Sequence, residues 1–376
     1  MEIEVFMPGF GLNVINLNIL KLQPWNYLLQ IAKNLAGQGY KVALTTIDVE
    51  VSLEVKNSLA EEGIVVQPFN KHTMSDMVIV PVAIGFLSKL INSLAYVKHR
   101  EIIGVLTTPL IDIRTLWINY VKVKLSKTSV VADALLYENI LFRLRTKLLC
   151  NHVRKLIVPS NDYSEILLRI LPCEIDTMTF IPEVSIPASI KDKAILSNGK
   201  KEVVISYFGP FSEERGVISL IKAFKKIRDY PIKMQLLIRD IGSGRIDLID
   251  ELVSKASNKI KVHIGNISKE ELFSKLILSD LIILPYRIIP STIPLAYLEA
   301  IMLNKPLVIA SNVPGINEHL KKYFPLRIRS TYTVNELGNI IIKLIEEQTI
   351  LNYSSNKQQK YVQDLKQKYA YQKVVL

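Results

Sequence analysis

The stretch that decides the fold runs from Leu281 to Leu320 and reads LIILPYRIIPSTIPLAYLEAIMLNKPLVIASNVPGINEHL. Its first residues, Leu281–Pro285, form an apolar run that predicts a strand covered on both faces. A loop, Tyr286–Pro290, leads to a helical pattern beginning near Thr292, and Leu307–Ala310 reads as the next strand. Strand, helix and strand in this order indicate a βαβ unit with parallel strands.

The beginning of that helix has the chemistry to hold a phosphate. Ser291 and Thr292 precede the helical pattern and are expected to cap it. The first N–H groups of a helix, here those of Ser291 to Ile293, lack intrahelical acceptors, and the macrodipole attracts anions to them. Glu299 follows about two turns along, where its carboxylate can accept hydrogen bonds from two hydroxyls, as a ribose presents. The alternative is an ordinary strand–helix–strand unit with Glu299 solvated.

The same alternation of strands and helices extends along the whole chain and is interrupted once. Pro182–Lys201 contains two prolines and a polar Ser-Asn-Gly-Lys-Lys run, which indicates a linker at 183–201. Two α/β domains, 1–182 and 202–355, follow from this pattern, and 376 residues is a length that fits two domains. Residues 356–376 are expected to form a basic helix that could pack back on the first domain.

Composition excludes several classes of protein. A hydrophobic fraction of 49% and a mean hydropathy of +0.23 exclude a disordered chain. Two cysteines, Cys150 and Cys173, are too few for a disulfide framework or a four-thiolate zinc site, and suit a reducing cytoplasm. The acidic N-terminal sequence does not read as a signal peptide, and the longest apolar run, Met77–Leu87, is shorter than the roughly 18 residues that span a bilayer. We therefore expect a cytoplasmic protein, soluble or peripheral to a membrane.

Three segments share their pattern with a known family. Leu298–Ala300 reads Leu-Glu-Ala, Lys305–Val308 reads Lys-Pro-Leu-Val, and Tyr207–Gly216 ends in Glu-Glu-Arg-Gly. Together they resemble the nucleotide-sugar half of the family-4, or group 1, retaining glycosyltransferases of the GT-B fold. That family has a Glu-x7-Glu element, a Lys-Pro-Val-Val strand and a Gly-Arg-Leu-x3-Lys-Gly loop. The resemblance covers Val203 to about Leu320.

The resemblance implies an α/β architecture of two Rossmann-like doubly wound domains facing a cleft. It implies a retaining transferase of the hexosyltransferase type, which moves a sugar from a nucleotide-sugar donor to a glycan or lipid-linked acceptor without a metal or cofactor. Arg215 and Glu299 are the expected catalytic residues, and Gly9 and Gly11, after the first strand, form either an acceptor-side wall or a plain turn. The expected donor-binding residues are Gly209, Arg215, Arg287, Ser291, Thr292, Ile293 and Glu299.

Some positions depart from the family pattern. The first Glu of the Glu-x7-Glu element falls on Ser291, the phosphate-binding Arg falls on Pro210, and the His expected after a first-half strand is absent from Leu106–Pro109. Arg215, at the family's Lys position, keeps the positive charge, and Arg287 could replace the missing cation. These departures leave open an alternative function, a catalytically degenerate GT-B protein that binds nucleotide or glycan without turnover.

A net charge of +12 favours anionic partners or serves solubility alone. Lys98–Lys155 holds 11 Lys and Arg against 4 Asp and Glu, a surplus of 7, with Trp117 and Tyr120 among them. Basic and aromatic residues together predict an anionic membrane surface or a lipid-phosphate acceptor as a partner, and a solvated helix face is the alternative. No nucleic-acid motif accompanies them, so nucleic acid is not an expected partner.

The histidines lack metal-ligand spacing, so no metal site is predicted.

Overall fold

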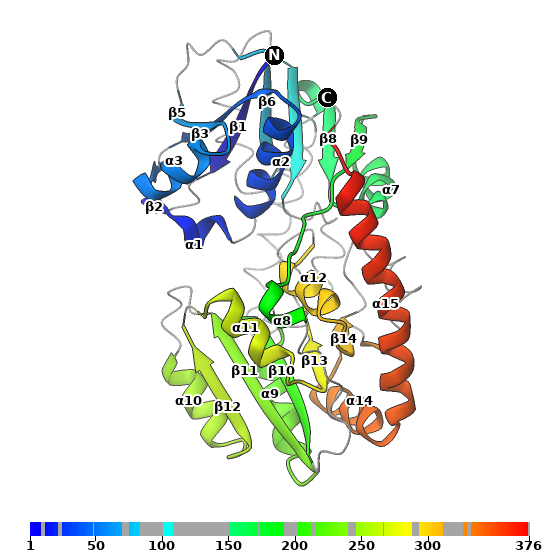
Figure 1. Cartoon of the computed structure of the whole chain (residues 1–376). Helices are drawn as coiled ribbons and strands as arrows, with labels where there is room; N and C mark the ends of the chain where they lie inside the picture. The colour runs from blue at the N-terminus through cyan, green and yellow to red at the C-terminus, as the bar shows by residue number, and fades with distance from the viewer. Residues whose placement is uncertain are drawn as a thin grey trace, which may run out of the picture.

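The computed structural model of the chain has two parallel sheets, one above the other in Figure 1, and a long helix beside both. The structure describes residues 1–8, 12–21, 25–47, 49–69, 75–82, 101–107, 147, 150–171, 173–191, 202–211, 215–239, 246–265, 267–287, 293–310, 326–328 and 332–374.

The first sheet has seven strands in the order β5-β3-β1-β6-β7-β8-β9, and its neighbouring strands pair in parallel. The chain thus starts in the middle of the sheet, builds outward on one side and then crosses to the other, which is the Rossmann order. The strands are β1 (Glu2–Pro8), β3 (Lys41–Ile47), β5 (Ile64–Pro68), β6 (Met77–Val82), β7 (Glu101–Leu106), β8 (Lys155–Val158) and β9 (Asp176–Thr179).

The second sheet repeats that order with six strands, β12-β11-β10-β13-β14-β15, again in parallel. Its strands are β10 (Val203–Pro210), β11 (Ile232–Arg239), β12 (Ile260–Ile264), β13 (Leu281–Leu284), β14 (Leu307–Ala310) and β15 (Arg327–Ile328). The chain order reverses between β10 and β13, so the sheet has a topological switch point there. Two Rossmann-like α/β units confirm the fold class expected from the sequence.

Helices cover both faces of the first sheet, which explains its nearly continuous apolar strands. Ile3 and Val5 of β1 face one core, which they share with Leu28 of α2, whereas Phe6 faces a second core that contains Tyr163 of α7. The described helices of this half are α1 (Leu17–Leu20), α2 (Trp25–Gly37), α3 (Leu53–Ala60) and α7 (Asn161–Ile170), and two short strands, β2 (Val14–Ile15) and β4 (Glu50–Val51), pair beside them.

The second half has its own core and its own capped helices. Thr333 and Glu336 form a capping box at the start of α14, as Ser268 caps α11. The helices are α8 (Ala188–Lys191), α9 (Val217–Lys226), α10 (Ile246–Ser254), α11 (Lys269–Leu276), α12 (Leu295–Met302), α14 (Val334–Glu346) and α15 (Gln348–Tyr371).

The last helix, α15, connects the two halves. Tyr361 and Leu365 pack in the core of the second half, whereas Val374, just past the helix, packs in a core of the first. The Gln372 side chain accepts a hydrogen bond from the Ile181 N–H at 3.0 Å and donates one to the Ile181 carbonyl at 2.9 Å. The end of the chain is therefore fixed to the segment that leaves the first sheet (Figure 1).

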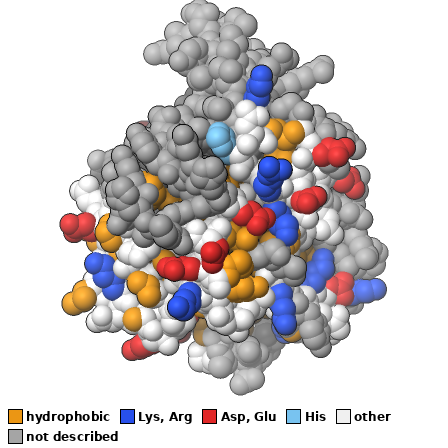
Figure 2. All heavy atoms as spheres, turned by 90° about the horizontal axis from the view of Figure 1, so that it is seen from above, with side chains coloured by type: hydrophobic (Ala, Val, Ile, Leu, Met, Phe, Trp, Pro, Cys, Tyr) orange, Lys and Arg blue, Asp and Glu red, His pale blue; other side chains and the backbone are white. Residues whose placement is uncertain are grey.

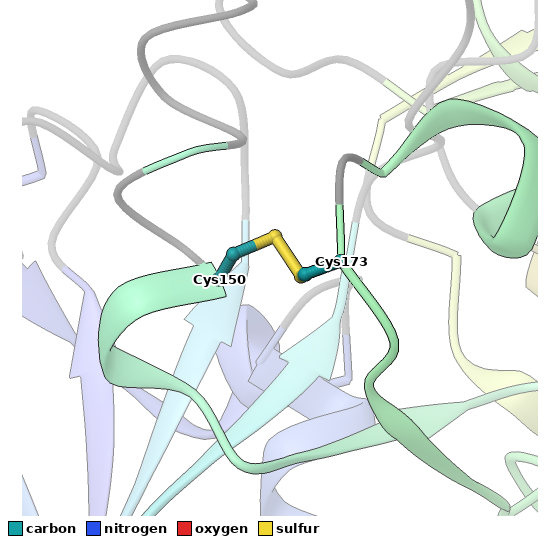
Figure 3. Close-up of a disulfide and its surroundings, with 2 residues drawn as sticks. All are labelled: Cys150 and Cys173. Atoms are coloured by element: carbon teal, nitrogen blue, oxygen red, sulfur yellow. A yellow bond between two sulfur atoms is a disulfide. The ribbon is translucent and has the colours of Figure 1, made fainter.

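Cys150 and Cys173 form a disulfide, which the spacing of the two residues did not predict. It connects the residues before β8 with those that lead from α7 into β9 (Figure 3). The two Cα atoms are 6.0 Å apart, and both side chains pack against the core on the α7 face of the sheet.

Within the ranges given above, the helices are all too short or too polar to cross a bilayer. In the view from above, described lysines and arginines are interspersed with aspartates and glutamates (Figure 2). Most of Lys98–Lys155, on which the membrane prediction rests, lies outside the described residues.

Candidate functional site

The switch point of the second sheet brings together two of the segments that carry the sequence motifs. Ile205 and Ser206 of β10 pair with Leu281 and Ile282 of β13, so both strands end at the same edge. The segment after β10 leads to Arg215 and α9, and the segment after β13 begins with Pro285. In sheets of this kind ligands bind at the carboxyl edge beside the switch point, so the candidate site lies here.

Arg215 packs on the ring of Tyr286, and the charge of Glu299 also acts on this tyrosine. The Arg215 guanidinium is 5.0 Å from the centre of that ring, a cation–π distance, and Tyr286 is 1% exposed. Burial raises the pKa of Tyr286; the positive charge of Arg215 opposes this rise, and the negative charge of Glu299 adds to it. Arg215 and Glu299 are themselves half-buried. The structure thus brings the two expected catalytic residues, which are far apart in the sequence, to one tyrosine.

Gly216 allows the turn into α9 to pack closely against the end of β13. Its φ is +73°, in the left-handed region that favours glycine. A Cβ atom at this position would lie 1.9 Å from the Pro285 carbonyl oxygen and 2.4 Å from the Tyr332 hydroxyl. Only glycine fits between these groups, so Gly216 determines where Arg215, the residue before it, is held.

Arg287 is held by groups of the protein. Its Nε and Nη2 donate to Ser219 Oγ at 3.3 and 3.0 Å, and Nη2 also donates to the Tyr332 carbonyl at 3.2 Å. The guanidinium lies 4.5 Å from the centre of the Tyr332 ring. A guanidinium has five N–H donors, and the two on Nη1 take no part in these bonds. Arg287 is therefore fixed in position through its Nε and Nη2 atoms, and its Nη1 atom takes part in none of these three hydrogen bonds.

Gly209 lies next to the last residue of β10, with a φ of +131°. Pro210, which stands where the resemblance expects an arginine, accepts a hydrogen bond through its carbonyl from the Tyr207 hydroxyl at 2.7 Å. Burial raises the pKa of Tyr207, so the phenol remains a donor. The backbone at the end of β10 is thus held by the hydrogen bond from the Tyr207 hydroxyl.

The prediction that α12 begins near Thr292, with Ser291 and Thr292 as its capping residues, is wrong. The helix begins at Leu295, its N-cap is Pro294, and no side chain caps it. The residue before a proline avoids the helical region, so Ile293 ends the loop, and Pro294, with a φ of −64°, suits the position at which a helix begins. The first N–H groups of the helix are consequently those of Leu295 and Ala296, and Ile293 is a buried loop residue, 3% exposed.

Four other predicted site residues lie outside the described residues. They are Gly9 and Gly11 of the acceptor-side turn, and Ser291 and Thr292 of the loop before α12. In the parts of the chain that the structure places, no three His, Cys, Asp or Glu side chains gather as they would around a metal ion.

Ser219 and Tyr332 contact Arg287, but the sequence analysis did not identify either of them as a site residue. Tyr332 is 45 residues from Arg287 and shares no motif with it. One signal does point to its place: Thr333 and Glu336 have the Thr-x-x-Glu spacing of a capping box, so Tyr332 is the residue just before a helix, and in the structure it stands between β15 and α14. In a parallel sheet such loops meet at the carboxyl edge.

Solved structures with this architecture are GT-B glycosyltransferases, and the fold is therefore GT-B. HepE from Anabaena, solved in complex with UDP, has a TM-score of 0.68 at 15% identity, covering 97% of this chain and 95% of that chain. Sucrose-phosphate synthase from Thermosynechococcus elongatus has a TM-score of 0.66 at 14% identity, covering 97% and 94%. WaaG, a glycosyltransferase involved in lipopolysaccharide biosynthesis, has a TM-score of 0.57 at 12% identity, covering 96% and 95%.

The second half of the chain also matches a family at the level of sequence. Residues 189–366 match the model of the glycosyl transferases group 1. This segment contains the switch point with Arg215, Arg287 and Glu299, so the resemblance predicted from the sequence motifs is confirmed there. No curated protein matches the chain.

Proposed function

We propose that this protein transfers a hexosyl group from a nucleotide-sugar donor to a glycan or lipid-linked acceptor, with retention of anomeric configuration and without a metal or cofactor. The observation that carries the proposal is the packing of the Arg215 guanidinium on the Tyr286 ring at the carboxyl edge of the second sheet, with Glu299 near enough for its charge to raise the pKa of that tyrosine. A cation and a carboxylate at this edge suit a nucleoside diphosphate, which presents phosphate charge and ribose hydroxyls together.

The donor residues have distinct roles in this proposal. Arg215 binds the diphosphate, assisted by the Nη1 group of Arg287, and Glu299 accepts hydrogen bonds from the ribose hydroxyls. Gly209 lets the backbone approach the donor. The loop of Ser291, Thr292 and Ile293 contributes backbone contacts to phosphate. HepE of Anabaena has been solved with UDP and with UDP-glucose, which supports a nucleotide-sugar as the donor.

The two domains divide the substrates between them. We assign the donor to residues 202–355 and the acceptor to residues 1–182, with Gly9 and Gly11 in the wall beside the acceptor. Residues 183–201 are the linker, and 356–376, which hold the larger part of α15 and the residues after it, are the basic C-terminal segment. This division is supported by the position of Arg215, Arg287 and Glu299 at the edge of the second sheet.

The chemistry balances without a base from the protein. The bond from the anomeric carbon to the diphosphate oxygen breaks, the acceptor oxygen bonds to that carbon on the same face, and the acceptor proton passes to the leaving diphosphate. Negative charge grows on the leaving group, and Arg215 stabilises it in a half-buried position, where electrostatic interactions are stronger than in water. The absence of a His at Leu106–Pro109 is compatible with this route.

Labelled donor sugars test the proposal. UDP-, GDP-, ADP- and CMP-sugars are first ranked by thermal shift, since binding to the folded state stabilises by about 2.7 kcal/mol at a hundredfold excess over Kd. Transfer or hydrolysis of the labelled sugar is then followed, and NMR of the product gives the anomeric configuration. Inversion, or activity abolished by EDTA and restored by Mg²⁺ or Mn²⁺, would reject the retaining or the metal-independent part of the proposal.

A second candidate is a GT-B protein that binds a nucleotide or glycan without turnover. The observation that favours it is Pro210, which has no side-chain cation and whose carbonyl is engaged by Tyr207. The same experiment separates the two functions, because a donor that shifts the melting temperature but is neither transferred nor hydrolysed indicates binding alone.

Glu299→Gln is expected to weaken affinity for the nucleoside diphosphate by roughly 1–3 kcal/mol, because the hydrogen bonds to the ribose lose their charge. Titration calorimetry measures this change. A 2′-deoxyribose analogue of the nucleotide should show a smaller difference between wild type and variant, since one of the two hydroxyls is gone. Equal affinity of both proteins for the ribonucleotide would contradict the role of Glu299.

We also propose that the protein is cytoplasmic and docks on an anionic membrane through the basic segment Lys98–Lys155. Each cation near an anionic surface contributes about 1 kcal/mol, so wild type should co-sediment with anionic but not neutral vesicles, in a salt-sensitive way. Changing Lys122, Lys124 and Lys127 together to Glu should release it and leave donor binding intact. No binding to anionic vesicles at low salt would reject the membrane as a partner.

A further inference from the structure

Tyr332 contacts Arg287 directly, and it also contacts the end of β13, on which Arg215 packs. Its ring lies 4.5 Å from the Arg287 guanidinium, and its backbone carbonyl accepts a hydrogen bond from Arg287 Nη2 at 3.2 Å. Its hydroxyl donates to the Pro285 carbonyl at 2.7 Å. Tyr332 is 3% exposed, and burial raises its pKa to about 12, so the phenol keeps its proton at neutral pH. Three different parts of one residue therefore make three contacts at the site.

The backbone of Tyr332 is fixed from the other side by the start of α14. Thr333, the next residue, is the N-cap: its Oγ accepts a hydrogen bond from the Glu336 N–H at 3.2 Å, and its own N–H donates to Glu336 Oε2 at 2.6 Å. A capping box of this kind satisfies two N–H groups at once and sets the path of the chain into the helix. The backbone from which the Tyr332 side chain extends is thus fixed by the capping box.

The hydroxyl contact reaches Arg215 through the end of β13. The Pro285 carbonyl oxygen and the Tyr332 hydroxyl, which are hydrogen-bonded to each other, both lie against Gly216, where there is no room for a Cβ atom. Tyr286, the residue after Pro285, has its ring against the Arg215 guanidinium. Holding the Pro285 carbonyl therefore holds both the turn that carries Arg215 and the ring on which Arg215 rests.

We propose that Tyr332 is a positioning residue for the donor diphosphate: its ring and carbonyl orient Arg287, and its hydroxyl orients Arg215 through Pro285 and Tyr286. The inference rests on the proposed function, because it takes the two arginines as ligands of the diphosphate. It predicts that a change at Tyr332 weakens the part of nucleotide binding that depends on phosphate and leaves the part that depends on the nucleoside.

The experiment uses the full chain and the nucleoside diphosphate, among UDP, GDP and ADP, that gives the largest thermal shift, together with the matching nucleoside. Tyr332→Phe removes only the hydroxyl, and Tyr332→Leu removes the ring as well. We expect the diphosphate affinity to fall about fivefold for Phe and a further tenfold or so for Leu. Nucleoside affinity should stay within about twofold of wild type for both, since neither arginine would contact it. Tyr230→Leu is the matched control and should change neither affinity, because Tyr230 packs against the same core but precedes β11, at the amino edge of the sheet.

A second pair of variants separates positioning from a general structural role. In an Arg287→Met background the ring has no guanidinium to orient, so Phe and Leu at position 332 should bind the diphosphate equally within about twofold. If the tenfold difference persists there, or if nucleoside affinity falls in parallel, Tyr332 only supports the fold and the inference is overturned. If Leu does not fold, the Phe variant decides alone, because unchanged diphosphate affinity contradicts the hydroxyl contact. Failure of wild type to bind any of these diphosphates or any nucleotide-sugar of the donor screen would instead overturn the proposed function.

Discussion

Gly216→Ala is expected to lower the free energy of unfolding by about 3 kcal/mol and to abolish tight binding of the donor diphosphate. The new methyl carbon would lie 1.9 Å from the Pro285 carbonyl oxygen, and this oxygen belongs to the backbone at the end of β13, which a rotamer change cannot move aside. The φ of +73° adds the strain of a non-glycine residue in the left-handed region. Thermal unfolding should show a fall of about 6–12 °C, and calorimetry the loss of binding.

Gly63→Ala is the matched control for that variant. Gly63 has a φ of +74°, but nothing lies within 4 Å of the Cβ atom that alanine would add. Gly63→Ala should therefore lower the free energy of unfolding only by the backbone strain, about 1 kcal/mol, and leave diphosphate binding unchanged. If the two variants lose equal stability, the close packing of Gly216 on Pro285 contributes nothing, and the position of Arg215 must depend on other contacts.

The longer strands of this protein could be predicted from the sequence because most of them are short apolar runs between polar or turn residues. The strand expected at Leu307–Ala310 agrees with the structure at both ends, and the one expected at Leu281–Pro285 ends one residue earlier, at Leu284.

The start of α12 was mispredicted because two local rules conflict there. Ser291 and Thr292 are good capping residues, yet Pro294 follows them and disfavours a helical Ile293. The proline prevails, since a backbone clash costs more than a missing cap. The sequence did contain the decisive residue, and giving it more weight would have placed the helix at Leu295.

The contacts that organise the site could not have been predicted, because each joins residues distant in the sequence. Ser219 and Arg287 are 68 residues apart, and Tyr332 and Pro285 are 47 apart. Motifs identified Arg215, Arg287 and Glu299 as residue types suited to a nucleotide, but only the order of the strands shows that they share one edge. The disulfide was missed for the same reason, since Cys150 and Cys173 belong to different elements around β8.

Reduction of the Cys150–Cys173 disulfide is expected to lower the free energy of unfolding of the first half by about 3 kcal/mol, because the cross-link closes a loop between residues 23 apart and restricts the unfolded chain. Thermal unfolding with and without a reductant measures the effect. Assay of thiols in the denatured protein, which should find none before reduction, establishes that the bond is present. Disulfides persist in oxidising compartments and in intracellular proteins of hyperthermophiles. If the protein is cytoplasmic, as proposed, the disulfide therefore predicts that it comes from a hyperthermophile.

A variant with Cys150→Ser and Cys173→Ser provides the control for reductant itself. It should melt at the temperature of the reduced wild type, and adding reductant should change nothing further. The donor site lies in the other half of the chain, with its own core, so diphosphate affinity should be the same in the variant, the reduced protein and the oxidised protein. A melting temperature that ignores reductant, together with two titratable thiols in the untreated protein, would contradict the cross-link. A fall in diphosphate affinity on reduction would show instead that the region around β8 is coupled to the second sheet.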